Sequence, residues 1–409
     1  MAFNHEGQTL NSNQLRLLRP IFNANKRVLA FQISQILRDS APLYTAVSYT
    51  WGEGQPSEVI LLNGKPFHVS VTLWSCLYYL CLSAQTSRWT HLWVDAICIN
   101  QNSIPEKSAQ VRFMDETYRK AACVSVWLGL APGAEQYRST TSEPIKTFDV
   151  EPFEWMDHMS DLVNRPYWTR FWVIQEFLLG KDVDIYCSGS QVNWIDFKDF
   201  VEYETNSDVF GDADRLRAGN AIADSCAALP FVLGRHPDKH PEVFRPLHEL
   251  LVEYHRSKAK DPRDRVFALL GLIPHEERAL LQRFFPDYSL SEEHMAIIAL
   301  AHVLCFDFMN GSERPVTVDS DELFRGLGIE QSVLRRRLLK SAKYIDYIGC
   351  DGIPMFLAQM EQVDFNENIG MDRDLEAEYS TTSSTTRHTM VMLIVTLFGI
   401  GAWIYWRFR

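Results

Sequence analysis

Residues 91–128 follow the pattern of a strand, a helix and a second strand, and this pattern limits the fold more than any other feature. His91–Asp95 (HLWVD) is a short apolar run, and Val124–Leu128 (VSVWL) is another. Between them, residues 103–121 carry apolar side chains at helical spacing after a Ser-x-x-Glu signal for a reciprocal capping box. Two buried strands joined by a crossover helix are the unit of a parallel sheet. The chain is therefore predicted to be an α/β protein.

A second unit of the same kind follows at residues 164–187. An Asn-Arg-Pro sequence at 164–166 is typical of a helix start, and Gly180 is typical of a helix stop. Val183–Cys187 (VDIYC) then predicts another strand of the same parallel sheet. Added N-terminal strands are expected before these units, and Asn63-Gly64 predicts a tight hairpin turn between two of them. These strands are predicted at residues 15–22, 27–36, 44–49, 58–62 and 65–69, with a helix at 71–83.

The rest of the chain divides by composition. An α/β domain is predicted over residues 1–190, followed by a mostly helical region over 191–360. Residues 361–388 are acidic and then rich in Ser and Thr, which is typical of a solvated tether. Residues 389–406 contain no charged side chain and are flanked by arginines.

The uncharged segment at 389–406 predicts a transmembrane helix, because 18 helical residues span about 27 Å, close to the thickness of the bilayer core. Trp403, Tyr405 and Trp406 gather at one end, where aromatic rings favour the membrane interface. The alternative is a buried terminal helix of a globular domain. The N-terminus has no signal-peptide core, so we expect a single-pass membrane protein with a cytosolic N-terminal domain. The basic flanks favour the mitochondrial outer membrane.

Composition excludes several classes of function. The chain has 52 acidic and 40 basic residues, for a net charge of −12, which argues against nucleic acid as a partner. It lacks the GxGxxG, GxxxxGK[ST], HExxH and GxSxG motifs, so no cofactor is predicted. The eight cysteines are scattered without a CxxC pair, and His236 and His240 are separated by a proline. We therefore predict reduced thiols and no metal site.

Polar residues lie where the predicted parallel strands end, which is the edge where open α/β sheets place ligands. Glu176 is the most informative, because its helix neighbours offer no continuous polar face and its carboxylate is expected to be partly buried. Such a carboxylate has either a structural partner, for which Arg170 and Arg165 are candidates, or a chemical role. The other candidate site residues are Ser48, Tyr49, Trp51, Asp95, Asn100, Gln101 and Trp172.

Two of these candidates have an equally simple structural role. Asp95 could cap the turn at residues 97–101 or contact a ligand. Trp51 could stack on a flat ligand ring or cover the edge of the sheet. The run Arg335-Arg336-Arg337 is interpreted as a solvated helix face, with a phosphate or anionic-lipid contact as the alternative.

Several motifs together resemble the heterokaryon incompatibility (HET) domain proteins of filamentous fungi. The resemblance extends over about residues 15–289 and assigns the HET domain to residues 1–190. It implies a role in non-self recognition and programmed cell death, with an unknown protein partner. The motifs are YTAVSYTWGEG (44–54), LWVDAICINQ (92–101), EKSAQVRFMDETYRKAACVSVWLG (106–129), RPYWTRFWVIQE (165–176), DPRDRVFALLGL (261–272) and PDYS (286–289).

The HET domain is in turn similar to the TIR domain, which implies a TIR-like parallel sheet flanked by helices. The segment FWVIQEFLLGKDVDIY resembles the TIR helix that carries a W-x-x-x-E motif before a strand. In TIR enzymes that cleave NAD this glutamate is catalytic, and it corresponds to Glu176. The resemblance thus implies NAD as a substrate, cleaved at the nicotinamide–ribose bond. The alternative is a non-enzymatic, self-associating scaffold, and a homo-oligomer is expected in either case.

Overall fold

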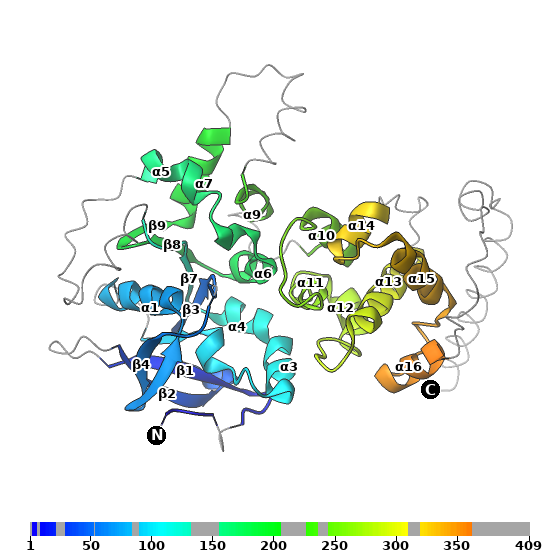
Figure 1. The fold of residues 1–409 in the computed structure, drawn as a ribbon, viewed down its shortest axis with the longest axis horizontal. Coiled ribbons are helices and arrows are strands. Elements are labelled where there is room, and N and C mark those ends of the chain that lie inside the picture. The colour runs from blue at the N-terminus through cyan, green and yellow to red at the C-terminus, as the bar shows by residue number, and fades with distance from the viewer. Residues whose placement is uncertain are drawn as a thin grey trace, which may run out of the picture. The chain divides into compact units, whose positions relative to one another are not determined.

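The computed structural model describes residues 2–5, 9–21, 29–52, 54–83, 90–131, 155–205, 226–235, 244–309 and 320–361. All of them belong to one compact unit, Met1–Gln362. Its elements form a mixed sheet with helices packed on it and a further set of helices in the C-terminal half (Figure 1).

The sheet has nine strands among the described residues, in the order β5-β4-β2-β1-β6-β3-β7-β8-β9. The four neighbours β6, β3, β7 and β8 pair in parallel, as the strand–helix–strand patterns predict. The strands are β1 (Gln14–Pro20), β2 (Ala30–Leu37), β3 (Tyr44–Tyr49), β4 (Glu58–Leu62), β5 (Lys65–Val69), β6 (His91–Trp93), β7 (Cys123–Trp127), β8 (Val183–Cys187) and β9 (Ser190–Asn193).

Outside these four strands the described sheet is mixed rather than parallel. Strands β1 and β2, β4 and β5, and β8 and β9 pair antiparallel, and β1 is antiparallel to β6. For β4–β5 and β8–β9 the reason is the length of the connection, because a two-residue turn allows only an antiparallel hairpin. Asn63 and Gly64 form such a turn with φ values of 49° and 77°, as their sequence predicts. Ser188, at φ 51°, begins the equally short turn between β8 and β9.

Helices surround the parallel strands and continue beyond them. Helix α1 contacts β3 and β4, whereas α6 contacts β3 and β7; the two helices lie on either side of these strands (Figure 1). The helices of the N-terminal half are α1 (Val71–Ser83), α2 (Asp95–Cys98), α3 (Ile104–Arg112), α4 (Met114–Lys120), α5 (Trp155–Leu162), α6 (Phe171–Leu179) and α7 (Trp194–Thr205). Those further on are α9 (Leu229–Gly234), α10 (Leu247–Glu253), α11 (Asp264–Phe267), α12 (His275–Leu281), α13 (Glu292–Met309), α14 (Ser320–Gly326), α15 (Ser332–Tyr344) and α16 (Ile353–Glu361).

The single crossover helix expected over residues 103–121 is two helices, α3 and α4. They meet at Phe113, whose φ of −109° and ψ of 14° break the helical geometry. The predicted capping box forms in one direction only. Ser103 Oγ accepts the backbone N–H of Glu106 at 3.4 Å, but the Glu106 carboxylate binds Arg16 instead of returning to the cap.

The predicted transmembrane helix and the single-pass membrane location derived from it require correction. The segment at 389–406 lies outside the described residues. Within the described ranges, no helix combines the length and the apolar character needed to cross a bilayer. The structure therefore gives no support to a membrane-spanning element or to a membrane as a partner.

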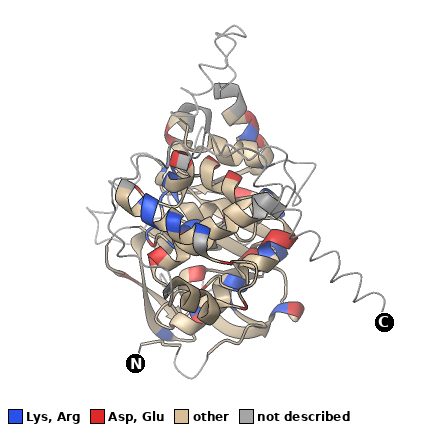
Figure 2. Ribbon diagram, turned by 90° about the vertical axis from the view of Figure 1, so that its right-hand side faces the viewer, with Lys and Arg blue, Asp and Glu red and all other residues tan. Residues whose placement is uncertain are grey.

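Charged residues of both signs are interspersed on the face that carries the C-terminal helices (Figure 2). Helix α15 carries the arginine run that was interpreted as a solvated face. Arg336 is exposed, but Arg335 pairs with Asp321 at 2.9 Å and Arg337 pairs with Glu293 at 2.6 Å. Part of this run therefore joins neighbouring helices. The eight cysteines are free thiols.

Candidate functional site

The carboxyl ends of β3 and β6 lie side by side and place polar residues together. The two strands pair in parallel with Ala46 opposite Trp93. Ser48 and Tyr49 therefore leave β3 at the same edge of the sheet at which Asp95 follows β6. Helix α6 packs against β3 at this edge and supplies Glu176.

Glu176 is buried, with 3% of its surface exposed, and it is held by hydroxyl groups. Ser48 Oγ donates a hydrogen bond to Glu176 Oε2. The Tyr118 hydroxyl, which donates to the backbone carbonyl of Val47 at 3.4 Å, also acts on the Glu176 carboxyl and lowers its pKa. The Tyr167 hydroxyl lies 2.7 Å from Ser48 Oγ. Because Ser48 has one proton to give, Tyr167 donates to Ser48 while Ser48 donates to Glu176. We call Ser48, Tyr118, Tyr167 and Glu176 the Glu176 cluster.

The surroundings of Glu176 favour its protonated form. Burial raises the pKa of the Glu176 carboxyl from 4.5 to about 7, and the negative charge of Asp95 raises it as well. The Arg170 guanidinium and the hydrogen bond from Ser48 lower the pKa, but less than burial raises it. A carboxyl group that titrates near neutral pH can change its charge during a reaction.

Asp95 is the second carboxylate of this edge and is covered by Trp51. Trp51 Nε1 donates to Asp95 Oδ2 at 2.8 Å, while the backbone N–H of Ala96 donates to Asp95 Oδ1 at 2.7 Å. Burial raises the pKa of Asp95, and Arg170 and the bond from Trp51 act in the opposite direction. The Trp51 ring is 42% exposed, so its surface stays open to solvent. The Asp95 carboxylate thus binds Trp51 and the backbone of Ala96, and neither contact is with the turn at residues 97–101.

Arg170 acts on both carboxylates, because its charge lowers the pKa of each. Its Nη1 donates to the backbone carbonyl of Tyr49. Arg165, the other candidate partner for Glu176, pairs with Asp161 instead. Of the two arginines considered from the sequence, only Arg170 belongs to this edge.

Three predicted site residues make other contacts. Gln101 Nε2 donates to the backbone carbonyl of Asp95 at 3.0 Å and so supports the loop. The backbone N–H of Asn100 donates to Glu106 at 2.8 Å. Trp172 acts on a different carboxyl group, that of Asp264, whose pKa it lowers.

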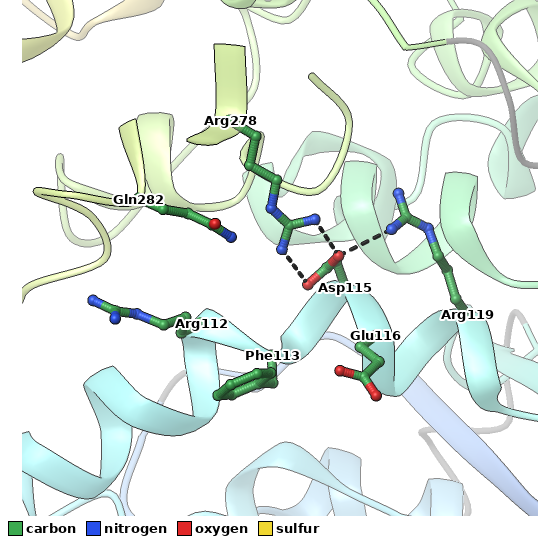
Figure 3. A pocket seen from close by; sticks show the side chains of 7 residues that line it. All are labelled: Arg112, Phe113, Asp115, Glu116, Arg119, Arg278 and Gln282. Carbon is green, nitrogen blue, oxygen red and sulfur yellow. Dashed lines mark hydrogen bonds and ion pairs between the residues drawn. The ribbon is translucent and has the colours of Figure 1, made fainter. Parts of the chain in front are cut away.

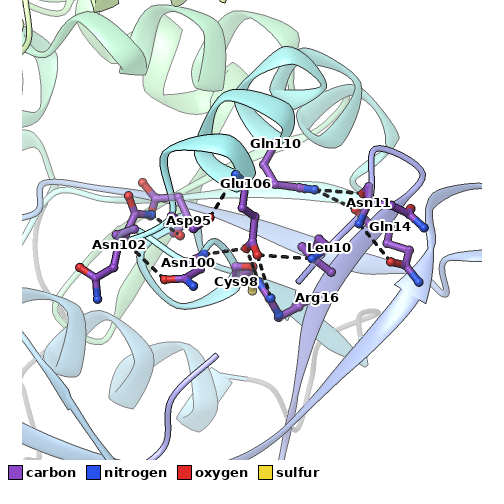
Figure 4. A network of polar contacts seen from close by, with 12 residues as sticks. Leu10, Asn11, Gln14, Arg16, Asp95, Cys98, Asn100, Asn102, Glu106 and Gln110 are labelled. Atoms are coloured by element: carbon purple, nitrogen blue, oxygen red, sulfur yellow. Dashed lines mark hydrogen bonds and ion pairs between the residues drawn. The ribbon is translucent and has the colours of Figure 1, made fainter. Parts of the chain in front are cut away.

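The contact of Asn100 belongs to a buried network that supports the loop after β6 (Figure 4). Arg16 Nη1 pairs with Glu106 Oε1 at 2.6 Å and also donates to the backbone carbonyl of Cys98 at 2.9 Å. Glu106 Oε2 accepts the backbone N–H of Leu10 at 3.3 Å. Both charged side chains have almost no exposure, so this network is structural and fixes the path of the loop that carries Asp95.

Tyr118 and Tyr167 are members of the cluster that sequence patterns do not single out. Tyr118 lies on the apolar stripe of the predicted helix, so its ring is expected in the core. In the structure this ring packs edge-on against Trp93. Tyr167 precedes Trp168 in a short helical turn, Pro166–Thr169. The only available signal is that a buried tyrosine needs a partner for its hydroxyl group. Within the described ranges, no group of His, Cys, Asp and Glu side chains is arranged to hold a metal ion.

Comparison with known proteins identifies the domain that contains this edge. Residues 44–176 match the family described as heterokaryon incompatibility protein (HET). A matching relative is heterokaryon incompatibility protein 6, OR allele, of Neurospora crassa, with 36% identity. The alignment covers 22% of this chain and 15% of that protein, so the chain matches only a small part of its relative. No solved structure matches the chain. The matched span begins at the first residue of β3 and ends at Glu176.

Proposed function

Because the chain is a fungal HET domain protein, we propose that it acts in non-self recognition and programmed cell death by cleaving NAD at the nicotinamide–ribose bond. The observation that carries the proposal is Glu176, a buried carboxyl group at the carboxyl edge of a parallel sheet with a pKa of about 7. The resemblance of its helix to the W-x-x-x-E helix of TIR enzymes supports the same assignment.

The reaction needs one carboxylate and no cofactor. The bond between ribose C1′ and the nicotinamide nitrogen breaks, and nicotinamide leaves with the electron pair as a neutral molecule. Positive charge then develops on C1′ and the ring oxygen, and ionised Glu176 stabilises it. Water adds to C1′ and loses a proton, for which Glu176 is the nearest base of the cluster. The products are nicotinamide, ADP-ribose and a proton.

The neighbouring residues have complementary roles in this proposal. Trp51 is the candidate for stacking on a flat ring of the substrate, because its indole is exposed whereas Tyr49 is only 3% exposed. Asp95 would accept hydrogen bonds from ribose hydroxyls once Trp51 turns away from it. Ser48 holds Glu176 in place and is positioned by Tyr167.

The proposal also requires the site to open. Glu176 and Ser48 are buried at 3% and 0% exposure, so substrate can reach the carboxylate only after side chains at this edge move. Gly52 and Gly54, which follow Trp51, have φ values of 78° and 100°, a backbone conformation that glycine adopts without steric cost. The closed arrangement also supports the second candidate function, a self-associating signalling scaffold with no chemistry.

The test is release of nicotinamide from NAD by the full-length protein at high protein concentration. We expect the wild type to release nicotinamide and Glu176→Gln to release at least 100-fold less, because the amide keeps the shape and loses the charge. Glu276→Gln, an exposed position on α12, is the matched control and should retain activity. Wild-type protein without activity would refute the enzymatic proposal.

The scaffold alternative predicts a different pattern. It predicts that wild type and Glu176→Gln self-associate alike in analytical ultracentrifugation and cause cell death alike when expressed in a fungal host. The enzymatic proposal instead predicts that Glu176→Gln abolishes cell death while self-association persists. Cell death that depends on Glu176 without any consumption of NAD would contradict both candidate functions.

A further inference from the structure

A pocket of about 400 Å³ lies between the α3–α4 junction and α12, and its lining includes no residue of the Glu176 cluster (Figure 3). Its lining residues come from two parts of the chain that are more than 150 positions apart. One wall lies inside the span that matches the HET family, and the other wall lies outside it. The lining residues are Arg112, Phe113, Asp115, Glu116, Arg119, Arg278 and Gln282.

Three arginines and two carboxylates line the pocket, and both carboxylates already pair with cations. A ligand in the pocket would therefore meet more positive than negative charge. Asp115 is engaged by two arginines: Arg278 binds it through both terminal nitrogens, at 2.5 and 2.8 Å, and Arg119 binds it at 3.0 Å (Figure 3). Glu116 pairs with Lys120 at 2.5 Å. One carboxylate thus serves two guanidinium groups, and the other is already paired with a cation from outside the lining.

Two further side chains at this pocket, Arg112 and Gln282, bond no other side chain among the described residues. Arg112 is exposed, and no described residue forms an ion pair with it. Gln282 is exposed at the C-terminal end of α12, on the wall opposite Arg112. In addition, Arg278 Nε is buried without a hydrogen-bond acceptor among the described residues. An anion in the pocket would therefore meet donors whose bonding capacity is not exhausted.

The electrostatics of Arg119 agree with this arrangement. Burial lowers the pKa of the Arg119 guanidinium, and the nearby Arg278 lowers it as well, while Asp115 raises it. The two guanidinium groups therefore repel one another across a single carboxylate. A second anion would relieve this repulsion.

We propose that this pocket binds a phosphorylated small molecule, with the phosphate group between Arg112, Arg278 and Gln282. Arginine side chains recognise phosphate through paired N–H donors, and the volume suits a molecule of the size of a mononucleotide. One face of Phe113 is occupied by Arg38, whose guanidinium carbon lies 5.1 Å from the ring centroid. The opposite face of Phe113 is the apolar surface available to the rest of the ligand. This site is independent of the proposed cleavage of NAD.

A ligand here would touch both the HET-matched helices and α12. It would strengthen a contact that now depends on the ion pair between Asp115 and Arg278. Binding to the folded state alone raises the apparent stability of that state. The expected effect of the ligand is therefore a higher melting temperature of the full chain.

The experiment is isothermal titration of the full-length protein with AMP and, separately, with inorganic phosphate. We expect AMP to bind, phosphate to compete with it, and Arg112→Ala to weaken AMP binding about tenfold, as the loss of a charge-assisted hydrogen bond predicts. Gln282→Ala should weaken binding less, and Arg112→Lys should retain part of it. Arg336→Ala, an exposed arginine on α15, is the matched control and should bind as the wild type does.

Three outcomes would overturn the proposal. The first is that neither AMP nor phosphate binds or raises the melting temperature at millimolar concentration. The second is that Arg112→Ala and Arg336→Ala weaken binding equally, because AMP binding would then depend on the net charge of the protein and not on this pocket. The third is that Trp51→Ala abolishes AMP binding while Arg112→Ala leaves it unchanged, which would place AMP at the Glu176 cluster. Arg112 and Gln282 are chosen because neither belongs to the ion pairs of Asp115, so both variants should fold.

Discussion

Replacing Glu176 by Gln is expected to change how the stability of the protein depends on pH. The Glu176 carboxyl has a pKa of about 7 in the folded protein, against 4.5 for an ordinary glutamate. Between these two values the folded state binds a proton more tightly than the unfolded state does. Stability is therefore expected to fall as pH rises from 4.5 to about 7, and to change no further above that.

The size of the effect follows from the two pKa values. The full loss corresponds to ~3 kcal/mol of unfolding free energy, and most of it falls between pH 5 and pH 8. Gln at position 176 is neutral throughout and still accepts the hydrogen bond from Ser48. Relative to the wild type, Glu176→Gln should thus gain ~2–3 kcal/mol over this interval.

The assay is urea unfolding of both proteins at pH 5, 6, 7 and 8, followed by tryptophan fluorescence. Glu276→Gln on the exposed face of α12 is the control. The difference in unfolding free energy between this variant and the wild type should not change with pH in the same way. A difference between Glu176→Gln and wild type that stays constant from pH 5 to pH 8 would show that Glu176 does not titrate in this range. Such a result would exclude a raised pKa at the buried Glu176 carboxyl group.

Three further substitutions test particular contacts. Glu106→Gln leaves Arg16 buried without its counter-ion and should lower the unfolding free energy by ~3 kcal/mol; an unchanged urea midpoint would show that this buried pair is dispensable. Gly180→Ala places a Cβ 2.5 Å from Val124 Cγ2 and should lower the unfolding free energy by ~1–3 kcal/mol. Adding Val124→Ala to the same chain should restore part of this stability. The absence of any rescue would argue against this contact. Trp51→Ala should raise the KM for NAD about tenfold, and Trp51→Phe should raise it less because a ring remains; equal effects in steady-state kinetics would exclude stacking.

The sequence predicts the parts of the fold that depend on local patterns. Strand β3 has the predicted bounds, and the Asn63-Gly64 hairpin forms because both residues accept positive φ values. The burial of Glu176 follows from the apolar residues around it on the helical wheel. Its contact with Ser48 depends on the packing of α6 against β3.

Contacts between residues far apart in the chain could not be predicted in this way. Local spacing assigns Glu106 to a capping box, but its carboxylate pairs with a residue 90 positions earlier, Arg16. Asp115 and Arg278 are 163 positions apart, and neither lies in a pattern that indicates its partner. The antiparallel pairing of β1 with β2 and with β6 depends on how these strands dock, which hydrophobic periodicity does not encode. The phosphate pocket is therefore visible only in three dimensions.

The most direct test of the central claim, that Glu176 is the catalytic carboxylate, is the pH dependence of nicotinamide release by the full-length protein. Because the ionised carboxylate stabilises the transition state, kcat/KM should rise with pH and level off above about pH 7. Glu176→Gln should show only the slow background rate at every pH. An equal rate of nicotinamide release by wild type and Glu176→Gln across this range would contradict the account.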